Sequence, residues 1–307
     1  MTNKIVAIQG DHPSKLNPIT DTSIFLASEV QYKYKIFYYE PKDLSIINSK
    51  VIASGFFIKF DDSKKKFFRI LNKKKLDLTK CKFVLIRQDP PFNLEYISTT
   101  YILDLIKDKV RVLNNPTSIR NVSEKLYSVK FQKYMPNTIF TQNIDEIKNF
   151  FKKHKKVILK PIHSYSGNDI HLLTSFNLKL IKKFIKQHNH IMCQKFIPKI
   201  SEGDKRVFLI NGKVCGAISR VPKKGSFLSN MSKGAKPINI KLTKIENKIS
   251  KLIAKDLKKQ NIFFAGIDFI DQKLNGDINV TSPTGLKTLY DLSGINLAKT
   301  FWRELKA

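Results

Sequence analysis

Strands and helices alternate in the first third of the chain, and this order constrains the fold more than any other feature. β-rich segments are predicted at residues 4–9, 35–39, 82–87 and 110–114, with helical segments at residues 23–32 and 94–107. Because strand–helix–strand units pair their strands in parallel, we expect a parallel sheet with helices on both faces. Pro90 and Pro91 break the chain after the third strand, at the edge where open α/β sheets bind ligands. Arg87 is therefore a candidate substrate-binding residue, the alternative being a surface arginine at a strand end.

The organisation changes after the Asn-Asn-Pro break at residues 114–116. The next segment predicts an α+β unit, with strands at residues 138–141, 157–162, 169–173 and 191–197 and helices at residues 144–154 and 178–188. Asn211-Gly212 then predicts a hairpin, which is followed by helices at residues 243–260 and 295–305. Residues 222–237 are rich in Gly, Ser and Lys, so we expect a mobile loop over an active site.

A second predicted hairpin, near the C-terminus, brings oxygen ligands together. Asp268 lies on an apolar strand, and Asn275-Gly276 is predicted to supply the turn to the next strand. Alternate side chains of a strand share a face, so Asp277 and Asn279 point the same way. Two carboxylates and an amide suit Mg²⁺, or Mn²⁺, as hard oxygen donors. The alternative is that each residue merely ends a strand at a turn.

The charge distribution argues against a nucleic-acid-binding protein, although the formal net charge is +31. Lysine is spread along the whole chain, whereas arginine, which phosphate forks favour, is scarce. The positive field still favours small anionic substrates. No nucleic acid is therefore expected as a partner.

Length and composition indicate a globular protein, with 307 residues of which 42% are hydrophobic. No apolar stretch is long enough to span a bilayer, so no membrane association is expected. The three cysteines are widely separated along the chain, which is typical of buried thiols in a reducing compartment. We therefore expect a cytoplasmic location.

Two lysines stand out from this basic background because they occupy ordered positions. Lys160 ends the apolar run Val-Ile-Leu, which packs its stem and aims its ammonium group as a point charge for phosphate. Lys125 lies in the first turn of a predicted helix. The alternative for both lysines is exposure to solvent. Residues 194–197 run from a strand into a hinge that could receive a purine.

Three motifs, in this order, carry a resemblance to a known family: Arg-Gln-Asp-Pro-Pro-Phe at residues 87–92, Gly-Asp-Lys-Arg at residues 203–206 and Ile-Asn-Val-Thr-Ser-Pro at residues 278–283. The chain resembles the bacterial glutathione synthetase family of the ATP-grasp superfamily over nearly its whole length. The resemblance implies an ATP-grasp fold of mixed α/β and α+β structure. Its parts would be an N-terminal parallel-sheet (pre-ATP-grasp) domain at residues 1–121, a central lid at residues 122–200 and a C-terminal metal-bearing core at residues 201–307.

The implied activity is ATP-dependent ligation of γ-glutamylcysteine to glycine through an acyl phosphate, with release of ADP and phosphate by a homo-oligomer. No protein nucleophile is required. The resemblance also implies roles for particular residues. ATP would be bound by Lys125, Lys160, Gly167, Gln194, Lys195, Phe196 and Ile197, the metal by Asp268, Asp277 and Asn279, and the substrates by Arg87 and Asn230, while Arg206 and Arg220 would face the transferred phosphoryl group.

The chain departs from the family pattern on the lid and on the substrate side. The phosphate loop at residues 163–168 keeps a single glycine, and Asp277 stands where the family has a longer Glu. The family's Arg-Gly-Asn reads Ser-Asn-Met at residues 229–231, and its Pro-Thr-Cys reads Pro-Thr-Gly at residues 283–285. Two alternatives stay open: a related carboxylate-amine ligase with another substrate pair, and a catalytically silent nucleotide-binding homologue.

Overall fold

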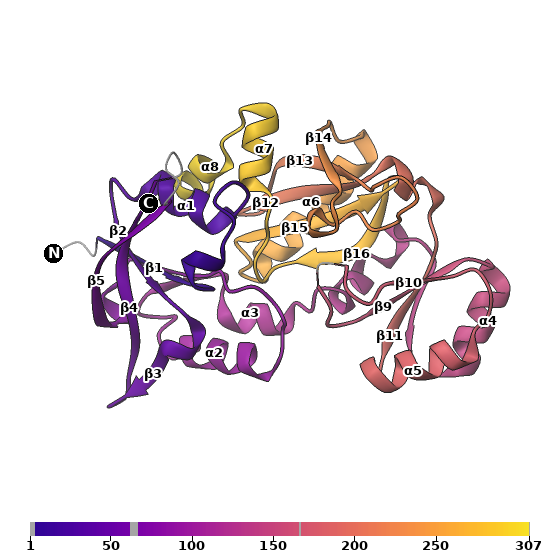
Figure 1. Cartoon of the computed structure of the whole chain (residues 1–307), viewed down its shortest axis with the longest axis horizontal. Helices are drawn as coiled ribbons and strands as arrows, with labels where there is room; N and C mark the ends of the chain where they lie inside the picture. Colours follow the sequence, from indigo (N-terminus) through magenta and orange to yellow (C-terminus); the bar gives the residue numbers. More distant parts are fainter. Residues whose placement is uncertain (1–3, 62–66, 166, 307) are drawn as a thin grey trace.

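The computed structural model of the chain describes residues 4–61, 67–165 and 167–306, and their strands form three sheets (Figure 1). The first sheet has the order β3-β4-β2-β1-β6-β7, with β5 paired to β4. The second has the order β10-β9-β11-β8, and the third β14-β13-β12-β15-β16. In Figure 1 the first sheet lies at the left and the second at the right, with the third between them.

The centre of the first sheet is parallel, as the alternation predicts. Its parallel strands are β1 (Ile5–Gln9), β2 (Lys35–Tyr39), β6 (Phe83–Ile86) and β7 (Arg111–Leu113). Ile24 of α1 (Thr22–Val30) packs in the cluster on one face, with Ile8. Tyr96 of α2 (Leu94–Asp104) and Ile119 of α3 (Pro116–Asn121) pack on the other face, with Val84. The prediction of helices on both faces is confirmed.

Three strands in this region were not predicted: β3 (Leu44–Ile47), β4 (Lys50–Phe60) and β5 (Phe68–Asp77). They are antiparallel and extend the sheet beyond β2, so the predicted parallel sheet has an antiparallel edge that the sequence did not predict. Most residues of β5 are exposed, and its polar run at Lys73–Lys75 lacks an apolar alternation. The strand is defined by pairing with β4 rather than by its own sequence pattern.

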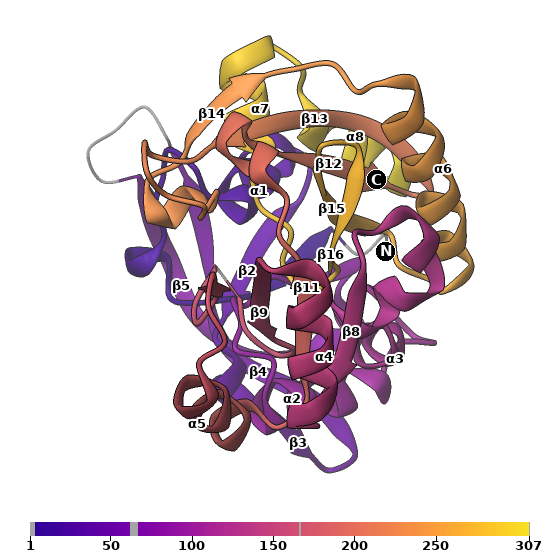
Figure 2. The ribbon, with the colours of Figure 1, turned by 90° about the vertical axis from the view of Figure 1, so that its right-hand side faces the viewer.

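The second sheet matches its predicted elements closely. Its antiparallel strands are β8 (Thr138–Thr141), β9 (Val157–Pro161), β10 (His171–Leu173) and β11 (Ile191–Lys195). Figure 2, seen from this end of the molecule, shows α4 (Ile144–His154) and α5 (Leu178–His188) beside these strands. Their apolar residues Ile147, Ile181 and Phe184 pack against the sheet. Amphipathic helices of this kind cover one face of a sheet.

The third sheet is antiparallel and carries both predicted hairpins. Its strands are β12 (Asp204–Ile210), β13 (Lys213–Val221), β14 (Lys236–Asn239), β15 (Phe264–Ile270) and β16 (Lys273–Asn279). The helix predicted at residues 243–260 is α6 (Lys244–Lys259), which begins with a capping box between Thr243 and Glu246. Ile253 and Leu257 of this helix join the cluster beneath the sheet.

The turn predicted at Asn275-Gly276 is wrong. The chain reverses at Asp271 and Gln272, which have φ angles of 46° and 61°. Gly276, with φ 88°, instead lies inside β16, where the register shifts. Residues 275–277 of β16 there face only Asp268 of β15, so the glycine permits a bulge rather than the turn.

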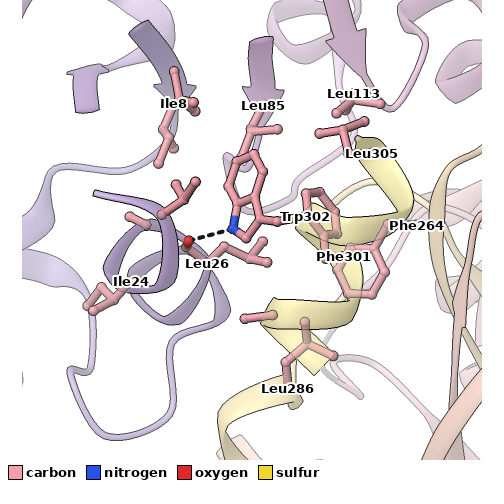
Figure 3. Packing of buried hydrophobic residues seen from close by; sticks show 14 of the residues in the cluster. Ile8, Ile24, Leu26, Leu85, Leu113, Phe264, Leu286, Phe301, Trp302 and Leu305 are labelled. Atoms are coloured by element: carbon pink, nitrogen blue, oxygen red, sulfur yellow. Dashed lines mark hydrogen bonds between the residues drawn. The ribbon is translucent and has the colours of Figure 1, made fainter. Parts of the chain in front are cut away.

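The C-terminal helices return to the first sheet and join it to the third. Figure 3 shows Trp302 of α8 (Leu297–Leu305), whose Nε1 donates a hydrogen bond of 2.8 Å to the carbonyl oxygen of Leu26. Leu289, from the unpredicted helix α7 (Leu286–Ser293), belongs to the same cluster. No helix within the described ranges combines the length and the apolar character that a membrane crossing requires.

Candidate active site

A cavity of about 290 Å³ lies where residues of the second and third sheets meet the loop after β6. The predicted site residues that line it are Lys125, Lys160, Gly167, Gln194, Lys195, Phe196, Ile197, Arg206, Arg220, Asn230, Asp268, Asp277 and Asn279. They come from widely separated parts of the sequence. The fold thus brings the predicted nucleotide, metal and catalytic groups to one place.

Arg87 is the predicted site residue that does not line this cavity. Its side chain is buried, its Nε donates a hydrogen bond of 3.0 Å to Oγ of Ser23, and its guanidinium carbon lies 6.0 Å from the ring centroid of Phe264. Burial lowers the pKa of Arg87, and Asp21 and Asp89 oppose this effect. Arg87 therefore packs against α1 and β15 and does not line the cavity.

Two arginines and two carboxylates form a buried network on neighbouring strands. Arg206 of β12 lies opposite Asp268 of β15 and donates two hydrogen bonds to its carboxylate, one of them 2.8 Å long. Arg220 of β13 lies opposite Asp204 and donates to it at 2.7 Å. Nη2 of Arg220 also lies 3.0 Å from Oδ2 of Asp268. The two positive and two negative charges balance, which buried ion pairs require.

The network shifts the ionisation of its members in different directions. Burial alone would raise the pKa of Asp268, but Arg206 and Arg220 lower it to about 2. Burial raises the pKa of Asp204 although Arg220 opposes it. Burial would also lower the pKa of Arg220, but the two carboxylates raise it. Of the two carboxylates in the network, Asp268 is thus the one that stays ionised to the lower pH.

Two buried lysines converge on Asp277. Lys125 lies directly before a 3₁₀ helix (Leu126–Tyr134), where the sequence predicts the first turn of a helix, and its Nζ is 3.5 Å from Oδ1 of Asp277. Lys160 at the end of β9 places its Nζ 3.5 Å from Oδ2 of the same carboxylate. Their exposed fractions are 3% and 4%, so the prediction that these lysines are ordered rather than solvent-exposed is confirmed.

Each of the two ammonium groups has further oxygen partners. Nζ of Lys125 donates to Oε1 of Glu124 at 3.1 Å and to the carbonyl of Ser164 at 3.0 Å. Nζ of Lys160 donates to the carbonyl oxygen and Oδ1 of Asn275, at 2.9 and 3.0 Å. Burial would lower the pKa of Lys125, but Glu124 and Asp277 raise it. Burial lowers the pKa of Lys160 despite Asp277.

The predicted metal ligands share one face of the second hairpin. Asp277 and Asn279 line the cavity, whereas Ile278 between them is fully buried on the other face. Nδ2 of Asn279 donates to the carbonyl of Gly266 at 3.3 Å, which leaves its Oδ1 outside that bond. In the described ranges no three His, Cys, Asp or Glu side chains gather into a metal cluster. Two carboxylates and an amide still fit Mg²⁺, which takes few protein ligands and completes its shell with phosphate and water.

The hinge after β11 forms a less polar part of the cavity wall. Gln194 is buried, and its Nε2 donates to Oγ1 of Thr138 at 3.0 Å. Apolar residues line the cavity beside it, namely Ile158, Ile170, Phe196, Ile197, Ile200 and Ile270. This combination of an apolar wall with fixed polar groups suits a planar heterocycle such as a purine.

Two loops meet over the cavity. The phosphate loop, residues 163–168, is described except for Ser166. Gly167 has φ 71°, and a Cβ atom on it would lie 2.3 Å from Oδ1 of Asn230 in the loop after β13. Next to it, Nζ of Lys233 donates to Oδ1 of Asn168 at 2.9 Å. The loop predicted at residues 222–237 therefore contacts the phosphate loop, although it also contains a 3₁₀ turn (Met231–Lys233) and the start of β14.

Several charged and polar residues that line the cavity were not assigned a role from the sequence: Asp89, Glu124, Asp204 and Asn275. Asp89 and Asp204 lie inside the quoted motifs, so the motifs held the signal. Glu124 directly precedes Lys125, and burial raises the pKa of its carboxyl although Lys125 opposes the shift. Their place in the cavity depends on strand register and burial, which the sequence alone does not show.

Comparisons with known proteins agree with this geometry. Residues 5–120 match the family described as prokaryotic glutathione synthetase, N-terminal domain, and residues 124–294 match prokaryotic glutathione synthetase, ATP-grasp domain. The glutathione synthetase of Bradyrhizobium diazoefficiens is 34% identical over 302 residues, covering 97% of this chain and 96% of the relative. That of Buchnera aphidicola subsp. Baizongia pistaciae is 35% identical over 296 residues, covering 94% and 91%.

Solved structures confirm the expected fold class. The D-alanyl-alanine synthetase A of Vibrio cholerae superposes with a TM-score of 0.63 at 15% identity, covering 98% of this chain and 97% of the other. A D-cycloserine synthetase superposes with a TM-score of 0.65 at 10% identity, covering 98% and 99%. At such low identity these structures establish the ATP-grasp fold alone. The two family matches and the full-length relatives establish more: this chain belongs to the prokaryotic glutathione synthetase family.

Proposed function

We propose that this protein is a glutathione synthase, an ATP-dependent ligase that joins γ-glutamylcysteine to glycine through an acyl phosphate. The main support is the convergence of Lys125, Lys160 and the Asp268–Asp277 hairpin on a cavity with an apolar hinge at its side. In this proposal residues 1–121 bind substrate, residues 122–200 form the lid and residues 201–307 form the metal-bearing core. A cytoplasmic location and a homo-oligomeric state are predictions that accompany this assignment.

In the first step the cysteinyl carboxylate of the dipeptide attacks the γ-phosphate of ATP. Lys125 and Lys160 would exchange their contacts with Asp277 for phosphate oxygens. A charge pair at 4 Å near a protein surface is worth about 4 kcal/mol, so two such lysines contribute substantially to phosphate binding. ATP-grasp ligases use ATP and divalent metals. A divalent cation held by the metal ligands of the hairpin would neutralise phosphate charge and polarise the γ-phosphoryl group.

In the second step the glycine amine attacks the carbonyl carbon of the acyl phosphate, and phosphate leaves. Arg206 and Arg220 are held by their carboxylate partners before any substrate arrives, so they can stabilise the developing charge without reorganisation. Positioning of the two reactants contributes roughly 7–11 kcal/mol when the attack geometry is maintained. Asn230 and the phosphate loop would exclude water, which competes with the amine for the acyl phosphate.

The test of the function is coupled ADP release by the purified full chain. We expect release that depends on both γ-glutamylcysteine and glycine. Turnover with only a different acid or amine from a substrate panel would favour a related carboxylate-amine ligase. ATP binding without ADP release across that panel would identify a catalytically silent homologue.

The metal assignment is tested by changing Asp277. Asp277→Asn should slow ADP release on the order of 100-fold, as expected when a preorganised charge that stabilises the transition state is removed. Asp277→Glu, which restores the family's side chain, should keep activity and its Mg²⁺ dependence. Asp271→Asn, in the turn of the same hairpin and outside the cavity lining, serves as the control. An active Asp277→Asn variant would show that Asp277 is not an essential ligand.

A further inference from the structure

Asp89 differs from the other carboxylates of the cavity in having no cation bound to it. Asp204 and Asp268 are held by arginines, and Asp277 and Glu124 lie beside lysines. Among the described residues no hydrogen bond or ion pair engages the Asp89 carboxylate, and its side chain is exposed at the cavity. A carboxylate in such a position is available to a cationic group of a substrate.

The loop that carries Asp89 is fixed in place on two sides. The backbone N–H of Asp89 donates to Oδ2 of Asp11 at 3.0 Å. The carbonyl of the preceding residue, Gln88, accepts a hydrogen bond of 2.8 Å from Oγ of Ser282. Ser282 follows the metal ligand Asn279 on the same segment and also lines the cavity. Asp89 is therefore held in a defined position relative to the metal hairpin.

Asp89 also lies on the side of the cavity away from the hinge. It follows β6 of the first sheet, whereas Gln194 lies in β11 of the second sheet, and the third sheet lies between these sheets in Figure 1. A nucleotide whose base is at the hinge and whose phosphates reach Lys125 and Lys160 would direct its γ-phosphate toward the Asp89 side. The acceptor substrates would then meet the activated carbonyl near Asp89.

The second step of the proposed reaction, the attack of glycine on the acyl phosphate, needs a carboxylate that is available to a cationic group. Glycine carries an ammonium group at neutral pH, and its nitrogen has no free electron pair until a proton is removed. We propose that Asp89 binds the glycine ammonium group and accepts its proton, as the general base of amide formation. This inference rests on the proposed function.

Each proton and each electron pair of this step has a defined destination. The Asp89 carboxylate takes one proton from the ammonium group and becomes a carboxylic acid. The freed nitrogen electron pair forms the C–N bond to the acyl carbon, and the C–O bond to phosphate breaks with its electron pair on the leaving oxygen. The second nitrogen proton leaves with the phosphate. Because the Asp89 side chain is exposed, it can release its proton to water before the next turnover.

The surroundings of Asp89 suit proton acceptance. Desolvation by neighbouring protein raises the pKa of Asp89 to about 6 even though the side chain keeps contact with solvent. Arg87 lowers this pKa, and Asp11 and Asp21 raise it. Asp89 is therefore mostly ionised at neutral pH, and it is a stronger base than an ordinary aspartate.

The experiment compares Asp89→Asn and Asp89→Glu with Asp108→Asn, an exposed change of the same charge outside the cavity lining. Two activities are measured with ATP and γ-glutamylcysteine. The first is ligation to glycine across pH 5–9. The second is trapping of the acyl phosphate by hydroxylamine, which is an uncharged nucleophile at neutral pH and needs no general base. The hydroxamate product reports the first step alone.

We expect Asp89→Asn to lower kcat/KM for glycine on the order of 100-fold, the usual contribution of a general base. The fall of this parameter below about pH 6 should disappear, while the KM values for ATP and γ-glutamylcysteine and the yield of hydroxamate stay unchanged. Asp89→Glu should restore part of the glycine activity and the pH dependence.

Three results would overturn the inference. Asp89→Asn could keep the glycine kinetics of Asp108→Asn, or it could raise the KM for γ-glutamylcysteine instead, which would assign Asp89 to the glutamyl ammonium group. It could also lose hydroxamate formation together with ligation, which would indicate a structural role. If the unmodified protein forms no hydroxamate from γ-glutamylcysteine, the proposed function itself fails and this inference falls with it.

Discussion

The carboxylates on the two sides of the cavity differ in burial and in whether a cation of the protein is bound to them. On the side of β12, β13 and β15, Asp268 and Asp204 are buried and each is held by an arginine. On the side of the first sheet, Asp89 is exposed and no cation of the described chain is bound to it. Paired buried charges fix geometry before a substrate arrives, whereas an unpaired carboxylate is available for a substrate cation. In the reaction that we propose, the first side stabilises the transferred phosphoryl group and the second binds the amine.

The largest effect, a loss of stability, is expected from removing Arg220, the cation that Asp204 and Asp268 share. Arg220→Met leaves Asp204 without its arginine and removes one of two arginines from Asp268. Breaking a buried network in this way costs about 3–5 kcal/mol of the free energy of unfolding. Urea unfolding monitored by circular dichroism measures this loss, and ADP release should fall with it.

Lys199→Met provides the matched control, because it breaks an exposed pair with Asp271 outside the cavity. Little change is expected for exposed pairs. If Arg220→Met were as stable as Lys199→Met, the buried network would not stabilise the fold more than an exposed ion pair does.

A smaller effect is expected from acid. The pKa of Asp268 lies near 2 in the folded protein, below its ordinary value of 3.8. A carboxyl group with a lowered pKa stabilises the fold above its unfolded pKa, and this contribution is lost as the pH falls from about 4 toward 2. Asp204 opposes the trend because its pKa is raised in the folded state. The free energy of unfolding of Asp268→Asn should therefore change less between pH 4 and 2 than that of the unmodified protein.

Measurement of the free energy of unfolding at several pH values tests this expectation. Asp108→Asn, whose side chain is exposed, should keep the slope of the unmodified protein. An unchanged slope in Asp268→Asn would mean that the arginines do not stabilise the ionised carboxylate.

Local patterns predicted the elements of the second sheet, and the shared face of Asp277 and Asn279, well. The bounds of α4, α5 and β8 agree with the prediction because each segment has its own apolar period and end signals. The shared face of Asp277 and Asn279 followed from the alternation of a strand. These features depend on residues close together in the sequence.

The sequence did not predict features that depend on contacts between residues far apart in the chain. The exposed strand β5 exists because it pairs with β4, and the salt bridge of Asp204 with Arg220 depends on the register of a hairpin. Asn275-Gly276 carries the signature of a turn, but the chain uses that glycine for a bulge. The exclusion of Arg87 from the cavity follows from its packing against Phe264 and its bond to Ser23, which no local pattern reveals.

The smallest effect is expected where the two loops meet over the cavity. Gly167→Ala places a side chain at φ 71°, which costs about 1–2 kcal/mol locally, and its Cβ would displace Asn230. Because the phosphate loop then loses close contact with its cover, the KM for ATP should rise a few-fold while the KM for glycine stays unchanged. Gly225→Ala is a matched control, since Gly225 has φ 83° but no atom within 4 Å of the added Cβ. A similar rise in both variants would trace the effect to backbone strain and not to the contact between the loops.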